Sequence, residues 1–296
     1  MAFTLNSIAL SDYGLTVSQA PSSNVGLENC WSMPERTGDC YYAWAESDSV
    51  QAFVASDDLF YAGRDLVLYA SVFGSYDEIR GHLSDLYAAV RAFTGLVTLV
   101  TPYGSFSVLV KSIDVEMLSG GARVVITFRE PVVTLTGGTL PAIAASSNTF
   151  DGIPMTSFGF YFSDAKELDS LPEMKEQFFT SYATEGYQIT NREANNLELN
   201  GFILATSLAD FQAKILALYK LFSSEGVRNV KLTDEITIEC FCKDGFQVTD
   251  VIVYDGGVVA RINIKLMATK NLQNIYILLS TYNNPILTTS NNNIII

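Results

Sequence analysis

Residues 75–90 read SYDEIRGHLSDLYAAV, and residues 207–222 read SLADFQAKILALYKLF, each position lying 132 after its counterpart. In both stretches apolar side chains recur at i, i+4, i+7, i+8 and i+11, which is one face of an amphipathic helix. They are Ile79, Leu83, Leu86, Tyr87 and Val90 in the first stretch and Phe211, Ile215, Leu218, Tyr219 and Phe222 in the second. An acidic residue follows each opening serine by three positions, which predicts a capped start. Because such short helices are marginal alone, each must pack against something larger.

Two further blocks repeat around these helices. Upstream, residues 32–35 (SMPE) match residues 170–173 (SLPE), 138 positions later, and this alignment also matches Tyr41 with Phe179 and Trp44 with Tyr182. Downstream, residues 122–126 (ARVVI) match residues 260–264 (ARINI). Two unrelated α+β domains often share one such helix, but three blocks in the same order indicate an internal repeat.

The rest of each copy has the short alternating runs of apolar and polar residues that are typical of strands. The predicted strands are 3–5, 65–72, 96–101, 105–113 and 123–128 in the first copy, and 158–162, 186–190, 197–205, 227–232, 236–242, 246–254 and 258–267 in the second. Glycine-containing turns at 119–121, 243–245 and 255–257 separate strands, and the last two have the composition of tight hairpin loops.

These patterns predict a mainly β (α+β) chain of two tandem β-sandwich or split-barrel modules, each with one amphipathic helix. We place the first module at 1–133 and the second at 153–270. Residues 134–152 are small, polar and almost uncharged, which predicts a linker. Residues 271–296 combine asparagine-rich stretches with an apolar end, which predicts a C-terminal arm that pairs with a neighbour.

Composition excludes several classes of protein. The net charge is −14 and lysine and arginine form no cluster, so we expect no direct binding of nucleic acid. The first basic residue is Arg36, which argues against a secretory signal, and no apolar run is long enough for a membrane-spanning helix. Four cysteines in 296 residues give no disulfide framework, and we expect a reducing compartment.

The sequence offers little for catalysis, and we expect no enzyme and no cofactor. Its one histidine, His82, lies off the apolar stripe of its helix, which argues against a catalytic triad or a histidine-rich metal site. Cys240 and Cys242 lie within one strand, while Cys30 and Cys40 lie in the other copy, so buried packing is favoured over a zinc site. No phosphate-binding glycine motif is present. A carboxylate pair for hydrolysis stays open, but nothing selects one.

The opening segment, residues 3–15 (FTLNSIALSDYGL), resembles the start of distal tail proteins of long-tailed bacteriophages. Residues 34–39 (PERTGD) resemble their Pro-x-Arg-x-Gly segment, and residues 63–65 (GRD) and 128–131 (FREP) continue the likeness across residues 1–133. The order of elements is similar to the tail-tube module of tube, distal-tail and hub proteins. The second half departs from this pattern, because it repeats the first half and has residues 174–176 (MKE) in place of the Arg-x-Gly loop.

This resemblance implies a virion tail protein, made in the bacterial host cytoplasm, that forms a ring between the tail tube and the tail-tip or hub proteins. DNA would pass through the ring without specific binding, and an acidic lining would help it slide. A distal tail protein would use six chains. A hub protein, the alternative, would use three chains whose two modules imitate six-fold symmetry. An alternative of another class is a carbohydrate- or host-surface-binding β protein that uses Trp31, Tyr41, Tyr42 and Trp44.

The predicted functional residues are contacts between subunits. They belong to an apolar, aromatic segment that both copies retain outside the helix, in a long loop (35–52) expected to reach the adjacent subunit or ring. In the first copy they are Pro34, Arg36, Tyr41 and Trp44, and in the second Pro172, Phe179 and Tyr182.

Overall fold

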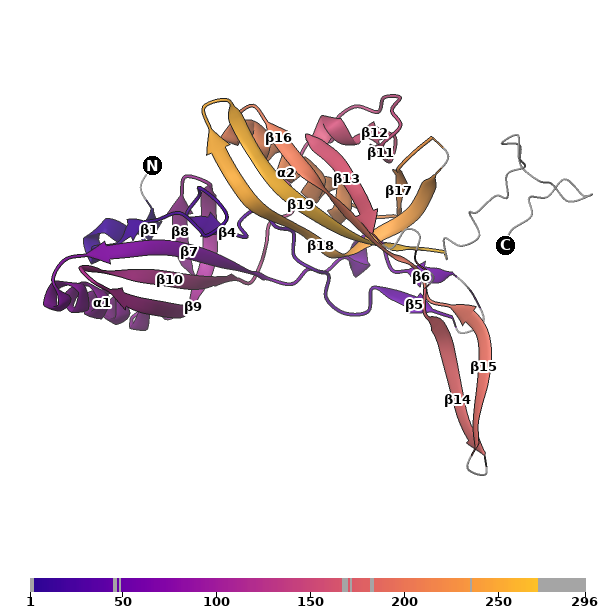
Figure 1. Cartoon of the computed structure of the whole chain (residues 1–296), viewed down its shortest axis with the longest axis horizontal. Helices are drawn as coiled ribbons and strands as arrows, with labels where there is room; N and C mark the ends of the chain where they lie inside the picture. Colours follow the sequence, from indigo (N-terminus) through magenta and orange to yellow (C-terminus); the bar gives the residue numbers. More distant parts are fainter. Residues whose placement is uncertain are drawn as a thin grey trace, which may run out of the picture.

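The computed structural model describes residues 3–44, 47, 49–166, 170, 172–181, 184–234 and 236–270. Within these residues the chain is mainly β, with two α-helices and antiparallel sheets, which confirms the predicted fold class. Figure 1 shows two bodies of sheet and helix beside each other, with a long hairpin that leaves the second body. In the described part of the chain, neither helix has the length and apolar character needed to cross a bilayer.

The first module is an eight-stranded antiparallel sheet with one helix. The sheet order is β2-β1-β8-β9-β10-β7-β3, with β4 also paired to β7. Helix α1 (Tyr76–Arg91) connects β7 to β8. The strands are β1 (Thr4–Leu5), β2 (Ile8–Ala9), β3 (Thr16–Val17), β4 (Leu27–Glu28), β7 (Arg64–Phe73), β8 (Val97–Thr101), β9 (Gly104–Leu118) and β10 (Gly121–Glu130).

Within the described residues, the second module repeats this topology without a counterpart of β4. Its sheet order is β12-β11-β17-β18-β19-β16-β13, and α2 (Leu208–Ser223) connects β16 to β17. Each strand takes the place of one in the first sheet, so that β18 corresponds to β9 and β19 to β10. The strands are β11 (Thr149–Phe150), β12 (Ile153–Pro154), β13 (Phe160–Lys166), β16 (Asn196–Ala205), β17 (Arg228–Lys231), β18 (Thr237–Tyr254) and β19 (Gly257–Ala268).

The repeat begins earlier than the three predicted blocks indicate. A pair of short strands leads into a 3₁₀ turn in each module, η1 (Leu10–Tyr13) or η3 (Met155–Phe158), and the turn ends at Gly14 (φ 68°) or Gly159 (φ 67°). The preceding turns share a left-handed residue, Asn6 at φ 51° and Asp151 at φ 50°. The second sheet therefore already includes β11, which corrects the predicted linker of 134–152. The two openings also resemble each other in sequence, because residues 4–15 (TLNSIALSDYGL) align with residues 149–160 (TFDGIPMTSFGF) at an offset of 145.

The helices begin as their sequences predict, with one difference. At α1, the Ser75 hydroxyl accepts from the Glu78 amide and the Glu78 carboxylate accepts from the Ser75 amide, which is a complete capping box. At α2, the Ser207 hydroxyl accepts from the Asp210 amide, but the shorter carboxylate of Asp210 accepts from the Thr206 amide instead.

Helix α2 is buried far more completely than α1. In α1 only Ile79, Leu83 and Leu86 are buried, whereas α2 buries all five predicted apolar residues together with Ala217 and Leu221. The reason is that α2 contacts its own sheet and also the first module, where Tyr219 meets Arg64 and Gln212 meets Tyr103. The backbone at Gly138 also packs against Leu216. One continuous hydrophobic core therefore runs through both modules.

The turn predicted at 243–245 is not a hairpin loop. Strand β18 runs without interruption from Thr237 to Tyr254, and its register with β19 shifts between Cys242 and Phe246. Gly245 lies in this bulge at φ 67°, and a Cβ there would lie 2.2 Å from the carbonyl oxygen of Met33. The glycine thus permits the close approach of the first module. The predicted turn at 255–257 does join two strands, because β19 begins at Gly257.

Each module carries a two-stranded hairpin at the same point of its topology. The hairpin of β5 (Tyr41–Ala43) and β6 (Val50–Ala52) lies between β3 and β7. The hairpin of β14 (Met174–Ser181) and β15 (Thr184–Arg192) lies between β13 and β16, and it projects away from both sheets in Figure 1.

Candidate functional site: the seam between the modules and the aromatic hairpin

Residues 23–36 of the first module lie along one edge of β18 in the second module; we call this contact the seam. Asn24 makes three hydrogen bonds there. Its amide nitrogen donates to the Val251 carbonyl at 3.1 Å, its side-chain nitrogen donates to the Val253 carbonyl at 2.6 Å, and its side-chain oxygen accepts from the Val253 amide at 2.7 Å. One asparagine therefore makes hydrogen bonds with three backbone groups at the edge of β18, as a paired strand would.

Other residues of this segment continue the pairing in the antiparallel sense. Two serine hydroxyls accept from backbone amides of β18, and two backbone amides donate to its carbonyls. The pairs are Ser23 with Val251 (3.0 Å), Ser32 with Val248 (3.0 Å), Met33 with Phe246 (2.8 Å) and Arg36 with Lys243 (2.8 Å). The segment thus covers the strand edge from Lys243 to Val253 without forming a regular strand.

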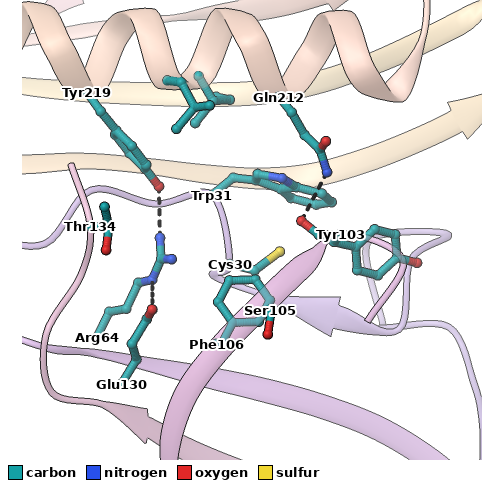
Figure 2. A pocket seen from close by; sticks show the side chains of 12 residues that line it. Cys30, Trp31, Arg64, Tyr103, Ser105, Phe106, Glu130, Thr134, Gln212 and Tyr219 are labelled. Carbon is teal, nitrogen blue, oxygen red and sulfur yellow. Dashed lines mark hydrogen bonds and ion pairs between the residues drawn. The ribbon is translucent and has the colours of Figure 1, made fainter. Parts of the chain in front are cut away.

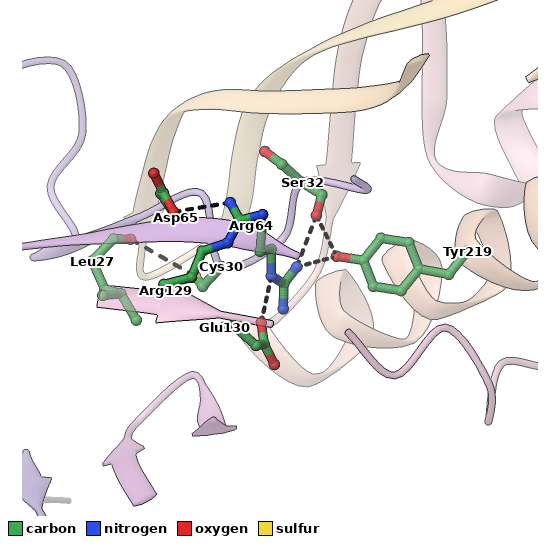
Figure 3. A network of polar contacts seen from close by, with 8 residues as sticks. All are labelled: Leu27, Cys30, Ser32, Arg64, Asp65, Arg129, Glu130 and Tyr219. Atoms are coloured by element: carbon green, nitrogen blue, oxygen red, sulfur yellow. Dashed lines mark hydrogen bonds and ion pairs between the residues drawn. The ribbon is translucent and has the colours of Figure 1, made fainter. Parts of the chain in front are cut away.

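A buried polar network crosses the seam (Figure 3). Arg64 of β7 and Glu130 of β10 are opposite residues, joined at 2.7 Å, and their side chains are only 9% and 8% exposed. Arg64 also donates to the Ser32 carbonyl and to the Tyr219 hydroxyl, both at 2.8 Å. The Tyr219 hydroxyl donates to the Ser32 carbonyl at 3.2 Å. The guanidinium therefore ties the first sheet to α2 of the second module.

The hydroxyl of Tyr219 stays protonated in this setting. Burial raises the pKa of Tyr219 to about 12, and the adjacent Arg64 only partly opposes that shift. As a neutral group, the hydroxyl can accept from Arg64 and donate to Ser32 at the same time.

A hollow of about 250 Å³ lies beside this network (Figure 2). Trp31 closes one side, and its ring lies edge to face with Tyr103 and with Phe211, at 5.2 Å between centroids in both cases. Gln212 of α2 donates to the Tyr103 carbonyl at 3.0 Å. Glu130 is the carboxylate of this lining and is already paired, so the hollow is a packing defect of the seam rather than a site arranged for proton transfer.

The predicted interface residues of the first copy divide into two groups. Pro34 and Arg36 are buried within the chain, and the Arg36 guanidinium donates to the carbonyls of Phe53 and Asp58. Tyr41 is half-buried against Phe241, at 6.1 Å between ring centroids. These side chains are occupied inside the chain, which leaves little of them for a neighbouring subunit.

Trp44 differs from these residues because it is exposed. Its side chain is 53% exposed, that of Tyr42 is 51% exposed, and their rings lie edge to face at 4.6 Å. Lys175 of β14 donates at 2.8 Å to the carbonyls of both Trp44 and Ser47, which ties the end of the first hairpin to the base of the second. We call Tyr42 and Trp44 the aromatic pair.

The predicted residues of the second copy are less well defined. Pro172 is half-buried, and its carbonyl accepts from Arg192 at 2.7 Å. Phe179 lies in β14, with its side chain outside the described part, and Tyr182 lies outside the described residues. Their interface role stays a prediction.

The remaining candidates for chemistry are the four cysteines and the one histidine. All four cysteines are buried and unpaired. Burial raises the pKa of the Cys30 and Cys240 thiols, and that of Cys242 to about 12, so these three are not activated as nucleophiles. His82 is half-buried against Gly14. Across the residues that the structure describes, no three histidine, cysteine or acidic side chains gather as a metal site would require.

Sequence reasoning missed the seam almost entirely. Ser23 and Asn24 are single polar residues in a loop and carry no periodicity, and their partners are more than 200 positions away. Arg64 was visible only as part of the motif at 63–65. The available signal was residues 32–35, which the repeat singles out and which lie in the middle of the contact.

Comparison with known proteins gives few matches. No protein-family model matches this chain, and no curated protein does. Among solved structures, the chain is similar to the Dit protein (gp 19.1) of SPP1, described as a paradigm of the hub adsorption apparatus in phages that infect Gram-positive bacteria. The identity is 13%, the match covers 89% of this chain and 98% of that one, and the TM-score is 0.34, so the similarity is one of general outline.

Proposed function

We propose that this chain is a structural protein of a bacteriophage tail or baseplate, of the distal-tail kind, that assembles with copies of itself into a ring. The observation that carries the proposal is the duplicated topology, in which two sheets with the same strand order each carry one helix between corresponding strands. The opening segment, which resembles distal tail proteins, recurs in backbone form at the start of the second module.

The seam supports a structural role over an enzymatic one. It joins the two modules through a shared core and through the buried hydrogen bond from Arg64 to Tyr219, which favours a rigid connection between them. A ring that bears the load of a tail needs such rigid units, whereas a hydrolase needs an accessible pair of titratable groups. The ring would continue the tail tube, contact tube and tail-tip or hub proteins, and let DNA pass. The net charge of −14 suits a channel that does not retain DNA.

A hub protein is the closest alternative within this proposal. Two modules with one topology in one chain allow three chains to imitate a six-fold ring. The mass of the purified protein separates the two, because the distal-tail reading expects six chains, or two stacked rings of six, and the hub reading expects three.

The test is light scattering and native mass spectrometry over a range of concentration and salt, with negative-stain images of the largest species. Rings with a central channel are the expected result. A monomer at every concentration would contradict self-assembly and favour a binding module.

Of the predicted interface residues in the first copy, Trp44 is the one whose side chain is exposed, and Tyr42 is exposed beside it. Replacing Trp44 and Tyr42 by alanine should weaken ring association about tenfold or more, because truncated interface aromatics typically cost more than 1 kcal/mol. Tyr254→Ala is the matched control, since Tyr254 is 54% exposed and lies on another surface. Equal effects of both changes would count against an interface at the hairpin.

The aromatic pair also favours a second function of another class, recognition of a carbohydrate on a host surface. Trp31 and Tyr41 do not contribute to such a surface, because Trp31 is only 5% exposed and Tyr41 packs on Phe241. Binding of the monomer to a glycan array, lost in Trp44→Ala, would support this function. If the protein forms rings and binds no glycan on the array, the structural role is supported instead.

A further inference from the structure

One strand edge of the first module is bare where its counterpart in the second module is covered. Strand β9 pairs with β8 only from Gly104 to Val108. From Leu109 to Leu118 it pairs with β10 on one side, and no described residue pairs with its other side. Ten residues of strand edge are therefore open, and an edge of this length is a ready template for another chain.

The register of the two sheets shows which residues correspond. Residues 122–126 of β10 match residues 260–264 of β19 in sequence, and these residues pair with β9 and β18 respectively. A residue of β9 therefore corresponds to a residue of β18 when their partners are matching residues of these two blocks. By this criterion Ile113 corresponds to Phe246, because their partners are Ile126 and Ile264, and Val115 corresponds to Val248, because their partners are Val124 and Ile262. Met117 lies opposite Ala122, whose counterpart Ala260 faces the β18 bulge between Thr249 and Ile252, so Met117 corresponds to this bulge, which contains Val251.

Corresponding side chains differ sharply in exposure. Val251 is 3% exposed, and Met117 is 43% exposed. Phe246 and Val248 are buried, at 1% and 3%, while Ile113 and Val115 are only half-buried. On the second module, Tyr219 and Phe222 of α2 pack against Phe246, with ring centroids 5.5 and 6.2 Å away, and residues 23–36 cover the edge of β18 at Val248 and Val251.

The backbone of the bare edge offers the same groups that are satisfied in the second module. The amides of Val248 and Val251 point away from β19, toward the serines of the seam. By the matching register, the amides of Val115 and Met117 point away from β10, into the open side. Half-exposed apolar side chains beside free amides and carbonyls fit an extended polypeptide better than a small molecule.

We propose that a second copy of this chain covers the β9 edge at residues 109–118. This rests on the proposed ring and specifies how it closes. Residues 23–36 of each copy are already engaged on that copy's own β18, so the covering element must come from the second module of the neighbour. The segment between β13 and β16 is its topological counterpart, and its residues 170–173 match residues 32–35 in sequence. First and second modules then alternate around the ring in a head-to-tail contact.

The other possible occupant is this chain's own end, residues 271–296. Lys270 pairs with Ser49 beside the β5–β6 hairpin, whereas β9 lies at the opposite end of the molecule (Figure 1). A second copy reaches the edge without crossing the whole chain, so it is the occupant we favour.

The experiment uses the full chain and two substitutions of matched exposure. Met117→Lys places a charge on the bare edge, as natural edge strands do to prevent pairing. Ile252→Lys is the control, because Ile252 is 44% exposed in β18 but faces the outer surface rather than the edge. We expect Met117→Lys to weaken self-association about tenfold or more in sedimentation velocity and Ile252→Lys to leave it unchanged.

Amide hydrogen exchange gives a readout at the edge itself. The amides of Val115 and Met117 should exchange slowly in the assembled wild type and at least about tenfold faster in the dissociated protein or in Met117→Lys. Rings that form with these amides still exposed would overturn the proposed edge and leave the proposed function standing. A wild type that never associates would overturn both. Protection in a monomer that disappears when residues 271–296 are removed would assign the edge to the chain's own end.

Discussion

Removing the charge of Glu130 tests whether the Arg64–Glu130 pair is as shielded from water as its low exposure implies. Glu130→Gln keeps the size of the side chain but leaves the guanidinium of Arg64 without its carboxylate, 2.7 Å away in the wild type. Breaking one partner of a buried pair costs about 3–5 kcal/mol. The glutamine oxygen still accepts one hydrogen bond from Arg64, which returns about 1 kcal/mol. We therefore expect the free energy of unfolding to fall by about 2–4 kcal/mol.

The measurement is equilibrium unfolding in urea, followed by far-ultraviolet circular dichroism, with calorimetry as a second probe. Glu116→Gln is the matched control, because Glu116 pairs with Arg123 at 3.4 Å while both side chains are about 60% exposed. A surface pair of this kind contributes about 0–1 kcal/mol. The double change Arg64→Met with Glu130→Leu should recover most of the loss, since it leaves no unpaired charge. If Glu130→Gln and Glu116→Gln cost the same, burial does not make the Arg64–Glu130 pair more important for stability than a surface pair.

Two further predictions concern the same seam. The pKa of Tyr219 is raised from 10.0 to about 12, so its contribution to the free energy of unfolding is complete below pH 10 and is lost as the pH rises from about 10 to 12. Urea unfolding at pH 9, 10.5 and 11.5 should show this loss in the wild type and a smaller loss in Tyr219→Phe. Parallel plots of stability against pH for the two proteins would contradict the prediction. Gly245→Ala should destabilise the chain by about 1–3 kcal/mol, because φ is 67° and the Met33 carbonyl oxygen lies 2.2 Å from the new Cβ. Gly81→Ala, in helix α1 with open space around it, should instead stabilise the chain by about 0.5–1 kcal/mol. Thermal unfolding should show changes in stability of opposite sign, and changes of the same sign would refute the close approach at the bulge.

Local patterns account for much of this fold. The spacing of apolar residues at 75–90 and 207–222 determined both helices, because an amphipathic stripe is a property of consecutive residues. Alternation located β7, β10 and β16 to within a few residues, but it missed β14 and ended β9 five residues early. The repeated block at 122–126 and 260–264 indicated the duplication that the matching sheet orders display.

Local patterns misled where a distant contact decides the conformation. Lys243 to Gly245 have the composition of a turn, yet β18 continues through them because the first module pairs with the strand there. Arg36 has the charge of a surface residue, but it is buried at 7% exposure under the segment of Phe53 and Asp58. Contacts between residues that are distant along the chain leave no local pattern in a single sequence.

The sequence by itself therefore determined the class, the helices and the duplication of this protein, since each depends on side chains close together along the chain. Tertiary structure alone decided the seam, the burial of α2 on a second side and the contrast between the covered edge of β18 and the open edge of β9. Ser23, Asn24 and Ser32 have no local signature, and they gain their role only because folding brings them to amides more than 200 residues away. Free strand edges are defined in the same way, by what packs beside them in space.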